Sequence, residues 1–363
     1  MRRSTLIALA VVTVPAAVAA VLLPPSGGGS VKTEAGDSVF PDVDKWIGAA
    51  TKLTVTGPTG AVVVERKAAN DKAPISEGWV LADKGYPVLE ATIKDILNGL
   101  VAMKKVEPKT DRPKLYARLD LDAPGKDSQS HEVELAKGDG ADILKLVIGK
   151  RKYDPLGQGN DGIYIRKTDD PRTWLAKPAI SVPTDALGWL DRKIVDVDAD
   201  TIKEIDLTPA GGKPLVVTRD KKEDKLAIKD LPKDAKLKEA EDPAENIAEA
   251  FRYLDLDDVK PVAQLSGPVT ATAHFETFNG LVGDISITAK DGSWVTVTAK
   301  GTGDGTKAAD EITKRTTGWA YRIPDARATT LETKLADLLA PPEKKDDKKA
   351  EAAKGKASEK PAD

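Results

Sequence analysis

Two segments of the chain begin with the same alternation of apolar and polar positions. Residues 52–67 read KLTVTGPTGAVVVERK, and residues 204–220 read EIDLTPAGGKPLVVTRD. In each segment, two runs rich in β-branched residues flank a turn that contains glycine and proline, which is typical of a β-hairpin. We therefore expect one hairpin near the start of each half of the chain.

Apolar residues at helical spacing predict one helix after each hairpin. In the first half these residues are Leu89, Ile93, Ile96, Leu97 and Leu100. In the second half they are Ile247, Phe251 and Leu254. The second helix has a clear start signal, because Asp242 can cap it, Pro243 suits its first turn and Glu245 completes a capping pattern.

The two halves also keep nearly the same spacing between these landmarks, which predicts an internal duplication. Leu53 and Ile205, at the start of the hairpins, are 152 residues apart. The prolines of the Val-x-Pro segments that follow the predicted helices, Pro108 and Pro261, are 153 residues apart.

Further strands and short helices complete each predicted unit. The remaining strands are expected at 131–135, 143–148 and 163–165 in the first half, and at 270–278, 284–289, 294–299 and 319–321 in the second. Asn279-Gly280 is a strong hairpin-turn signal. Short helices are expected at 184–190 and 330–339, the latter with Leu331, Leu335 and Leu338 on one face. The pattern predicts an α+β fold of two tandem, internally duplicated units, each a mainly antiparallel sheet with one or two packed helices.

The N-terminus predicts a membrane segment. Residues 4–31 carry no charge, and residues 6–23 form an apolar run at the lower limit for spanning a bilayer. Arg2 and Arg3 precede this run, which favours a cytoplasmic N-terminus and a periplasmic remainder of the chain. The alternative is a cleaved signal peptide, for which Ala17-Val18-Ala19 would be the cleavage site. We expect a single-pass inner-membrane protein and leave cleavage open.

The rest of the chain divides by composition. We expect a membrane anchor or signal peptide at 1–23, a flexible linker at 24–41, the first α+β repeat at 42–197, the second at 198–340 and a disordered Lys/Glu/Ala tail at 341–363. Cysteine is absent from the sequence, which excludes a lipoprotein, disulfides, thiolate metal sites and a cysteine nucleophile. The formal net charge of −3 gives no electrostatic case for nucleic-acid binding.

Two glycine-rich strings resemble nucleotide-binding loops only superficially. Residues 157–162 match G-x-G-x-x-G, but this string precedes a predicted strand, whereas a dinucleotide site needs a helix there. Residues 301–305 lack the Gly-Lys-Ser/Thr ending of a phosphate loop. We interpret both as turns or loops.

The acidic and histidine candidates are no more specific. The alternating acids Asp196, Asp198 and Asp200 resemble the start of a calcium-binding loop. Such a loop needs glycine at its sixth position and glutamate at its twelfth, where this chain has Thr201 and Leu207. We therefore expect a solvated edge strand. Asp255, Asp257 and Asp258 follow the second predicted helix and are interpreted in the same way. His131 and His274 are expected to begin comparable strands, and a Ser-His-Asp site is not excluded although no G-x-S-x-G elbow exists. We assign no catalytic, cofactor-binding or metal-binding residue, and no cofactor.

The aromatic residues favour a structural role. Aromatic residues make up only 4% of the chain, so the tryptophans of the folded part are expected in the core, with a glycan-stacking surface as the alternative. These tryptophans are Trp79, Trp174, Trp189, Trp294 and Trp319. We match Tyr164 in the first half with Tyr321 in the second, and an arginine flanks each of them, Arg166 and Arg322. Strand alternation predicts that both arginines are solvated.

A set of motifs between about residue 40 and residue 325 resembles a bacterial family of uncharacterised domains of unknown function. The motifs are Lys-Leu-x-Val from Lys52, Trp79, Tyr86-Pro87, Val106-Glu107-Pro108, Tyr116-Ala117-Arg118-Leu119, Ile148-Gly149-Lys150-Arg151, Gly162-Ile163-Tyr164-Ile165-Arg166, Trp174-Leu175 and Trp189-Leu190-Asp191-Arg192. The resemblance implies one N-terminal membrane anchor and genes encoded beside an ABC transporter permease and a gliding-motility-type auxiliary subunit. It implies no catalytic residues.

These observations predict a membrane-anchored periplasmic accessory or binding protein without catalytic activity. Its expected partner is an ABC transporter permease or auxiliary subunit, contacted through sheet edges or a cleft. The alternatives are an envelope glycan-binding protein and a hydrolase that uses a pair of carboxylates. Buried tryptophans would weaken the first alternative, and desolvated carboxylates that converge in a cleft would favour the second.

Overall fold

The computed structural model describes residues 35–340, apart from 68–73, 159, 233–234 and 239–241. The predicted anchor at 1–23 and the predicted tail at 341–363 lie outside the described residues. Within the described part of the chain, no helix is long and apolar enough to cross a membrane.

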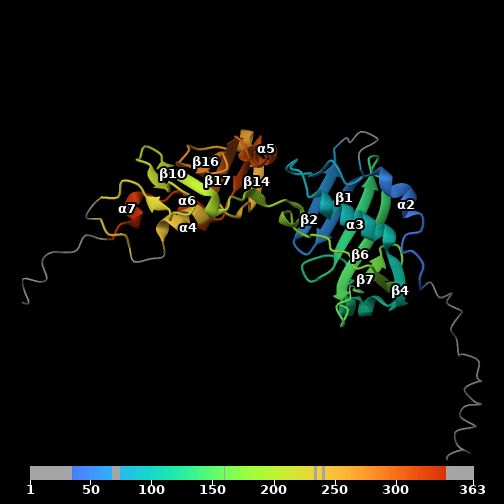
Figure 1. The fold of residues 1–363 in the computed structure, drawn as a ribbon. Coiled ribbons are helices and arrows are strands. Elements are labelled where there is room, and N and C mark those ends of the chain that lie inside the picture. The colour runs from blue at the N-terminus through green and yellow to red at the C-terminus, as the bar shows by residue number, and fades with distance from the viewer. Residues whose placement is uncertain (1–34, 68–73, 159, 233–234, 239–241, 341–363) are drawn as a thin grey trace, which may run out of the picture. The chain divides into compact units, whose positions relative to one another are not determined.

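The first eight-stranded sheet has the order β3-β2-β1-β5-β6-β7-β8-β4 (Figure 1). Its strands are β1 (Ala50–Gly57), β2 (Gly60–Arg66), β3 (Trp79–Leu81), β4 (Lys104–Pro108), β5 (His131–Lys137), β6 (Asp142–Lys152), β7 (Gly162–Lys167) and β8 (Thr173–Lys177). The helices in this part of the chain are α2 (Val43–Trp46) and α3 (Glu90–Ala102), with 3-10 turns η1 (Ile47–Ala49), η2 (Pro113–Leu119) and η3 (Leu187–Trp189).

The second eight-stranded sheet has the order β12-β11-β10-β15-β16-β17-β18-β14. Its strands are β10 (Ile202–Pro209), β11 (Leu215–Thr218), β12 (Ala227–Ile228), β14 (Asp258–Pro261), β15 (Ala271–Thr277), β16 (Leu281–Ala289), β17 (Ser293–Gly301) and β18 (Trp319–Arg322). Four helices accompany it: α4 (Pro243–Glu249), α5 (Gly305–Thr316), α6 (Asp325–Leu331) and α7 (Leu335–Leu338). The 3-10 turns η4 (Ala199–Thr201) and η5 (Val262–Gln264) and a small sheet of β9 (Lys193–Val195) and β13 (Leu254–Asp255) complete the structure. Mixed helices and antiparallel sheets confirm the predicted α+β class.

The described residues separate into two compact units. The first contains 35–62, 74–76 and 93–184, and the second contains 63–67, 77–92 and 185–340, apart from the gaps named above. Residues 36–39, which the sequence assigns to the end of the linker, pair with β4 in the first unit: the Gly36 N–H donates to the Lys105 carbonyl at 2.7 Å, and Ser38 forms a bridge with Lys104.

The first predicted helix is confirmed as α3, which lies across the strands of the first sheet (Figure 1). Its apolar face buries Ile93, Ile96 and Leu100, each no more than 1% exposed. Gly99 lies on the same face, and a Cβ there would come within 2.3 Å of an Ile180 methyl group. Glycine at this position therefore permits a closer approach than alanine would.

The second predicted helix starts as expected but is shorter. Asp242 caps α4, because its carboxylate accepts the Ala244 N–H at 3.2 Å. The helix ends at Glu249 rather than continuing to Leu254. Tyr253 adopts a left-handed conformation with φ of 50°, and Leu254 then pairs with Val195 in β13. A left-handed residue cannot continue a right-handed helix, so the apolar spacing misled the prediction here.

The two terminal helices were also predicted too long. Only the 3-10 turn η3 forms within 184–190. The region 330–339 contains the end of α6 and the short α7, separated at Glu332–Lys334. In α7 the side chain of Asp337 accepts the Lys334 backbone N–H at 3.0 Å, which starts a new turn rather than continuing the old one.

Several elements were missed, among them the strands β3, β4, β12 and β14. β8 pairs with both β7 and β4, and with β3, β4 and β8 the first sheet has three more strands than the five expected. Helix α5 follows the glycine-rich string 301–305 and packs against β17 and β16. Ala309 and Ile312 are its buried apolar residues, which is a weak apolar face for a pattern-based prediction.

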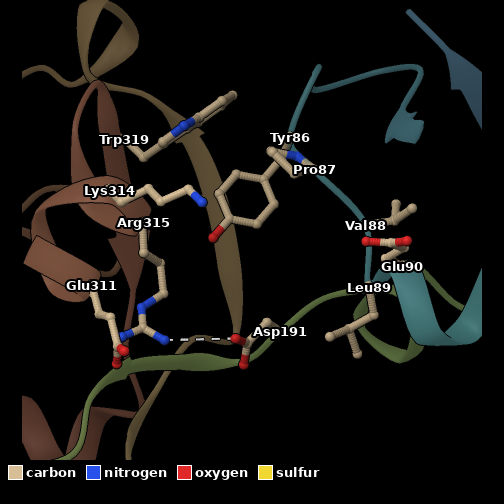
Figure 2. A pocket seen from close by; sticks show the side chains of 10 residues that line it. All are labelled: Tyr86, Pro87, Val88, Leu89, Glu90, Asp191, Glu311, Lys314, Arg315 and Trp319. Carbon is tan, nitrogen blue, oxygen red and sulfur yellow. Dashed lines mark ion pairs between the residues drawn. The ribbon is translucent and has the colours of Figure 1, made fainter. Parts of the chain in front are cut away.

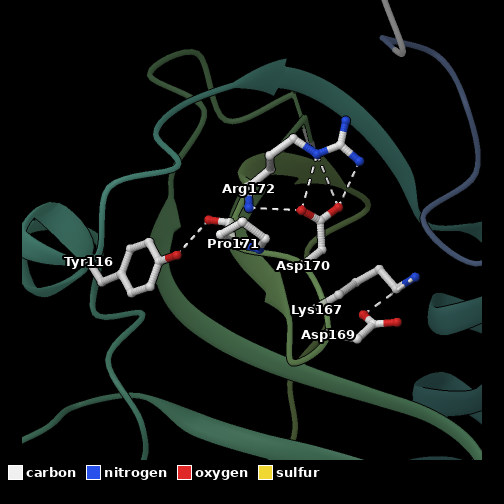
Figure 3. A network of polar contacts seen from close by, with 6 residues as sticks. All are labelled: Tyr116, Lys167, Asp169, Asp170, Pro171 and Arg172. Carbon is white, nitrogen blue, oxygen red and sulfur yellow. Dashed lines mark hydrogen bonds and ion pairs between the residues drawn. The ribbon is translucent and has the colours of Figure 1, made fainter.

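A short cap covers part of the first sheet around Val147. Tyr116 of η2 and Leu121 pack on Val147. The Tyr116 hydroxyl donates to the Pro171 carbonyl at 2.6 Å (Figure 3). Beside it, the Asp170 carboxylate accepts hydrogen bonds from Arg172 at 2.7–3.1 Å. The Tyr116 bond ties η2 to the turn between β7 and β8, and the Arg172 bonds hold that turn.

Candidate functional site

A cavity of about 460 Å³ in the second unit is the candidate binding site (Figure 2). Its wall is formed by residues 86–90, by Asp191, and by residues 311–319 of α5 and the start of β18. A volume of this size accommodates one or two large side chains or a small ligand.

Backbone hydrogen bonds to β3 fix the segment that carries Tyr86. The Tyr86 carbonyl accepts the Leu81 N–H at 2.9 Å, and the Val88 N–H donates to the Trp79 carbonyl at 3.1 Å. The Leu89 N–H donates to the Trp189 carbonyl at 2.8 Å. The segment is therefore held on both sides while the Leu89 side chain stays 37% exposed at the cavity.

Three aromatic rings meet at this wall. The Tyr86 ring packs edge-on against Trp319, with centroids 4.8 Å apart, and against Tyr321, with centroids 6.2 Å apart. The hydroxyls of Tyr86 and Tyr321 are 3.5 Å apart, and the Tyr321 hydroxyl donates to the Arg315 carbonyl at 2.8 Å. Burial raises the pKa of both phenols above the ordinary tyrosine value. Both phenols are therefore neutral near pH 7.

Charged side chains of both signs line the rest of the cavity. The Arg315 Nη1 lies 3.6 Å from the Asp191 carboxylate, the ion pair drawn in Figure 2. Among the described residues, the Arg315 Nε is the one buried side-chain polar atom without a hydrogen-bond partner. Lys314 extends toward the cavity and is exposed, and Glu311 is also exposed. The cavity thus combines an apolar wall with groups that can pair with charge.

The glycine-rich string 157–162 is a loop between β6 and β7, as expected. The Asp154 carboxylate organises it by accepting the backbone N–H groups of Leu156, Gln158 and Asn160 at 3.1–3.4 Å. These hydrogen bonds lower the pKa of Asp154. The second string, 301–305, is a turn that leads into α5.

The acidic candidates are held by basic neighbours. Asp196 accepts Lys193 Nζ at 2.9 Å and lies in a connection after β9, not on an edge strand as predicted. Asp257 pairs with Arg192 at 3.4 Å, and Asp258 pairs with Lys84 at 2.8 Å. Within the described ranges, no group of three or more histidine, cysteine, aspartate or glutamate side chains is placed to hold a metal ion.

The two histidines do not occupy comparable positions, which corrects the prediction. His131 is the first residue of β5, whereas His274 is in the middle of β15. The His274 Nδ1 lies 2.7 Å from an Asp284 carboxylate oxygen, and Asp206 is opposite His274 on β10. Burial, with a smaller contribution from Glu204, raises the pKa of Asp206, but this row lies outside the candidate cavity.

The expected core role of the tryptophans is confirmed for most of them. Trp79, Trp174, Trp189 and Trp294 are buried. Trp319 is half-buried and lines the cavity.

The match of Tyr164 with Tyr321 is wrong, because Tyr164 lies on β7 and Tyr321 on β18. In strand order β18 corresponds to β8, and Trp174 and Trp319 are the residues that face Pro108 and Pro261. Arg166 is half-buried: it donates to the Leu121 carbonyl at 3.2 Å, so its predicted solvation is only partial. Arg322 is exposed as predicted.

The cavity residues themselves were not identified from the sequence. In the sequence, Tyr86 belongs to a motif and Trp319 is expected in the core. The two positions are 233 residues apart, so no local sequence pattern indicates that they lie together. Arg315 and Lys314 belong to the helix that the pattern missed. A prediction of α5 would have been needed to place Lys314 and Arg315 on one helix.

Comparison with known proteins yields one family. The model described as Domain of unknown function (DUF4340) matches residues 79–271. No curated protein and no solved structure matches the chain.

Proposed function

We propose that this chain, which belongs to the family described as Domain of unknown function (DUF4340), is a non-catalytic binding or accessory protein of a membrane transport system. The observation that carries the proposal is the cavity lined by Tyr86, Leu89 and Trp319 on one side and by Arg315 and Lys314 on the other. In this proposal the cavity is the contact point for a partner protein.

The chemistry of the wall supports binding rather than proton transfer. A general base must lose its proton near the working pH, but the pKa values of Tyr86 and Tyr321 are raised and both hydroxyls are engaged in hydrogen bonds. Neutral aromatic side chains instead provide a rigid apolar surface with a polar edge.

The partner segment that fits is extended and carries one aromatic or branched apolar side chain with charged neighbours. The apolar side chain would bury the exposed part of Leu89 and the half-exposed ring of Trp319. Its charged neighbours would pair with Lys314 and with Glu311, the exposed ions of opposite sign at the rim.

The identity of the partner and the cellular location rest on the N-terminal sequence and the family resemblance. The charge-free run behind Arg2 and Arg3 supports a single inner-membrane anchor with the bulk of the chain in the periplasm. The gene neighbourhood implied by the resemblance points to an ABC transporter permease or its auxiliary subunit. No nucleic acid is part of the proposal.

The proposal includes an internal duplication. Its support is that the two eight-stranded sheets have the same order when their strands are taken in sequence. In both sheets the edge strand ends at a proline that is paired with a tryptophan, Pro108 with Trp174 and Pro261 with Trp319.

The experiment is a pull-down of the full-length chain, tagged at its C-terminus, from detergent-solubilised membranes, with mass spectrometry of the recovered proteins. Leu89→Glu places a charge in the apolar wall and is expected to lower recovery of the permease or auxiliary subunit at least about tenfold. Val269→Glu is the matched control, since Val269 is also exposed, at 47%, and is not part of the cavity.

Recovery of transporter subunits by the unaltered chain and by the Val269 variant, but not by the Leu89 variant, supports the proposal. Equal recovery by both variants removes the cavity as the contact point. A chain that recovers no transporter subunit overturns the accessory role, and glycan binding and glycan hydrolysis would then be assayed.

A further inference from the structure

One end of the first sheet gathers basic side chains from neighbouring strands. The register pairs Lys152 of β6 with Gly162 of β7, and Ile163 of β7 with Ala176 of β8. Lys104 of β4 lies directly opposite Lys177 of β8. Lys152, Lys177 and Lys104 therefore share one end of four adjacent strands.

The basic end forms a groove that fits an anion. Three lysines, Lys104, Lys105 and Lys177, and one acid, Asp161, line a cavity of about 490 Å³, together with Gly36, Val106, Asn160 and Pro178. Like charges directly opposite on neighbouring strands destabilise a sheet, so the Lys104–Lys177 pair is unfavourable until an anion lies between the ammonium groups.

Acidic side chains lie near this end, but lysines outnumber them, since three of the residues that line the groove are lysines and one, Asp161, is acidic. Beside the backbone hydrogen bonds of its loop, Lys177 also helps to lower the pKa of Asp154. The Asp161 carboxylate lies 4.0 Å from Arg151 and accepts the Asp154 N–H at 2.8 Å. The Asp154 carboxylate accepts backbone N–H groups of its own loop. The Asp37 carbonyl accepts the Lys105 N–H.

The same end presents the two most exposed large apolar side chains of the described protein. Tyr153 is 71% exposed and Leu156 is 76% exposed, and both lie on the loop that follows β6. The hydrogen bonds to Asp154 hold this loop in a defined shape, and the Arg151 guanidinium lies 6.0 Å from the Tyr153 ring centroid. Aromatic and aliphatic side chains beside lysines are typical of surfaces that lie in the membrane interface.

The chain itself brings this end close to the predicted anchor. Residues 36–39 are hydrogen-bonded along β4, and the predicted membrane run ends at residue 23. The twelve residues between, 24–35, span about 45 Å when fully extended and about 20 Å as a flexible chain. Both lengths keep the lysines within reach of the headgroup layer.

We infer that this end of the first unit, formed by Lys104, Lys177, Tyr153 and Leu156, rests on the membrane surface and binds anionic phospholipid headgroups. The lysine groove receives the headgroup phosphate, and Tyr153 and Leu156 enter the interfacial layer. The inference rests on the membrane anchor of the proposed function. It adds to that function a fixed orientation of the first unit on the bilayer.

The test uses the absence of cysteine in the natural sequence. In the full-length chain, Leu156→Cys is labelled with a fluorophore, and the chain is reconstituted into vesicles that contain a lipid with a nitroxide on its headgroup. Gly138→Cys is the matched control, because Gly138 lies in the turn between β5 and β6, at the opposite end of the same sheet. The 11 residues of β6 separate the two ends by about 36 Å.

We expect quenching at position 156 but not at position 138 in vesicles with anionic lipid. Zwitterionic vesicles, or the Lys104→Gln/Lys177→Gln variant in anionic vesicles, should reduce the quenching at 156. The expected loss in the headgroup-bound population is about fivefold for each lysine, or about 25-fold for the pair.

Flotation of the same vesicles separates this inference from the anchor. If the chain floats but positions 156 and 138 are quenched equally, the inference is overturned and the anchor stands. If the chain floats with no vesicle, both are overturned. If it floats only with anionic lipid and loses this with the lysine variant, the anchor is overturned, and headgroup binding by this end is supported without it.

Discussion

Replacing Tyr321 by phenylalanine tests its hydrogen bond to Arg315, a residue that lines the candidate cavity. The side chain is fully buried, and its hydroxyl donates to the Arg315 carbonyl at 2.8 Å. The change keeps the ring and its packing on Tyr86 but removes the donor. The Arg315 carbonyl at the end of α5 then loses its side-chain partner.

The magnitude follows from the cost of an unsatisfied buried group, about 1–3 kcal/mol. For a domain of 150–250 residues, each kcal/mol corresponds to a shift of about 2–4 °C in the melting temperature. We therefore expect Tyr321→Phe to lower the free energy of unfolding of the second unit by about 2 kcal/mol and its melting temperature by about 4–8 °C.

The assay is thermal and denaturant unfolding of the full-length chain in detergent, followed by tryptophan fluorescence. Trp319 packs on the same tyrosine pair, so its signal reports the affected region. Tyr253→Phe is the control, because Tyr253 is 58% exposed and its change should shift stability by less than about 0.5 kcal/mol. If the two variants unfold at the same temperature, the hydrogen-bond argument for the cavity wall is refuted.

Three further predictions concern other parts of the chain. Gly283→Ala should destabilise the second sheet by about 2 kcal/mol, because the alanine Cβ would lie 2.3 Å from the Phe275 ring. The control is Gly48→Ala, whose Cβ meets open space and should change the midpoint of denaturant unfolding little. The hydrogen bond from Arg172 lowers the pKa of Asp170, and burial opposes this effect. The stability that this pair contributes is therefore complete above the pKa of the unfolded state, about 3.9, and is lost as the pH falls through the lower pKa of the folded state. Asp170→Asn should thus cost stability at pH 7 but much less at pH 3, and an unchanged gap in the urea midpoint at pH 3 would contradict the assignment. In an alkaline titration followed by tyrosinate absorbance, the two cavity tyrosines should ionise only when the chain unfolds, since burial raises both pKa values.

Patterns that repeat within a few residues predicted the elements well, and interruptions of those patterns explain the errors. The hairpins and α3 follow from alternation and from the spacing of Ile93, Ile96 and Leu100. The end of α4 depends on the left-handed turn at Tyr253, and no local apolar pattern encodes that. Helix α5 begins at a single glycine, Gly305, and buries few apolar residues, so its periodic signal is weak.

The candidate cavity could not be derived from the sequence, because its contacts are not local. Tyr86 and Tyr321 are brought together by pairings that involve β3 on one side and β14 and β17 on the other. From the sequence, Tyr86 was only an element of a family motif and Tyr321 a strand residue matched with Tyr164. The lysine end of the first sheet has a similar origin, since Lys104 and Lys177 become neighbours only through the missed strand β8.

The two sheets protect corresponding edges in different ways. On β14, Pro261 has no N–H to offer, and the Val259 N–H is taken by the Asp258 carboxylate at 2.8 Å, so the edge has few free donors. On β4, the exposed edge is instead covered by residues 36–39 of the same chain. This covering segment follows the predicted anchor and linker, so in the proposed orientation the contacts that cover the edge of the first sheet also set which end of that sheet is tethered. The lysine groove lies at the same end, so the proposed membrane orientation would depend on the hydrogen bonds that protect this edge.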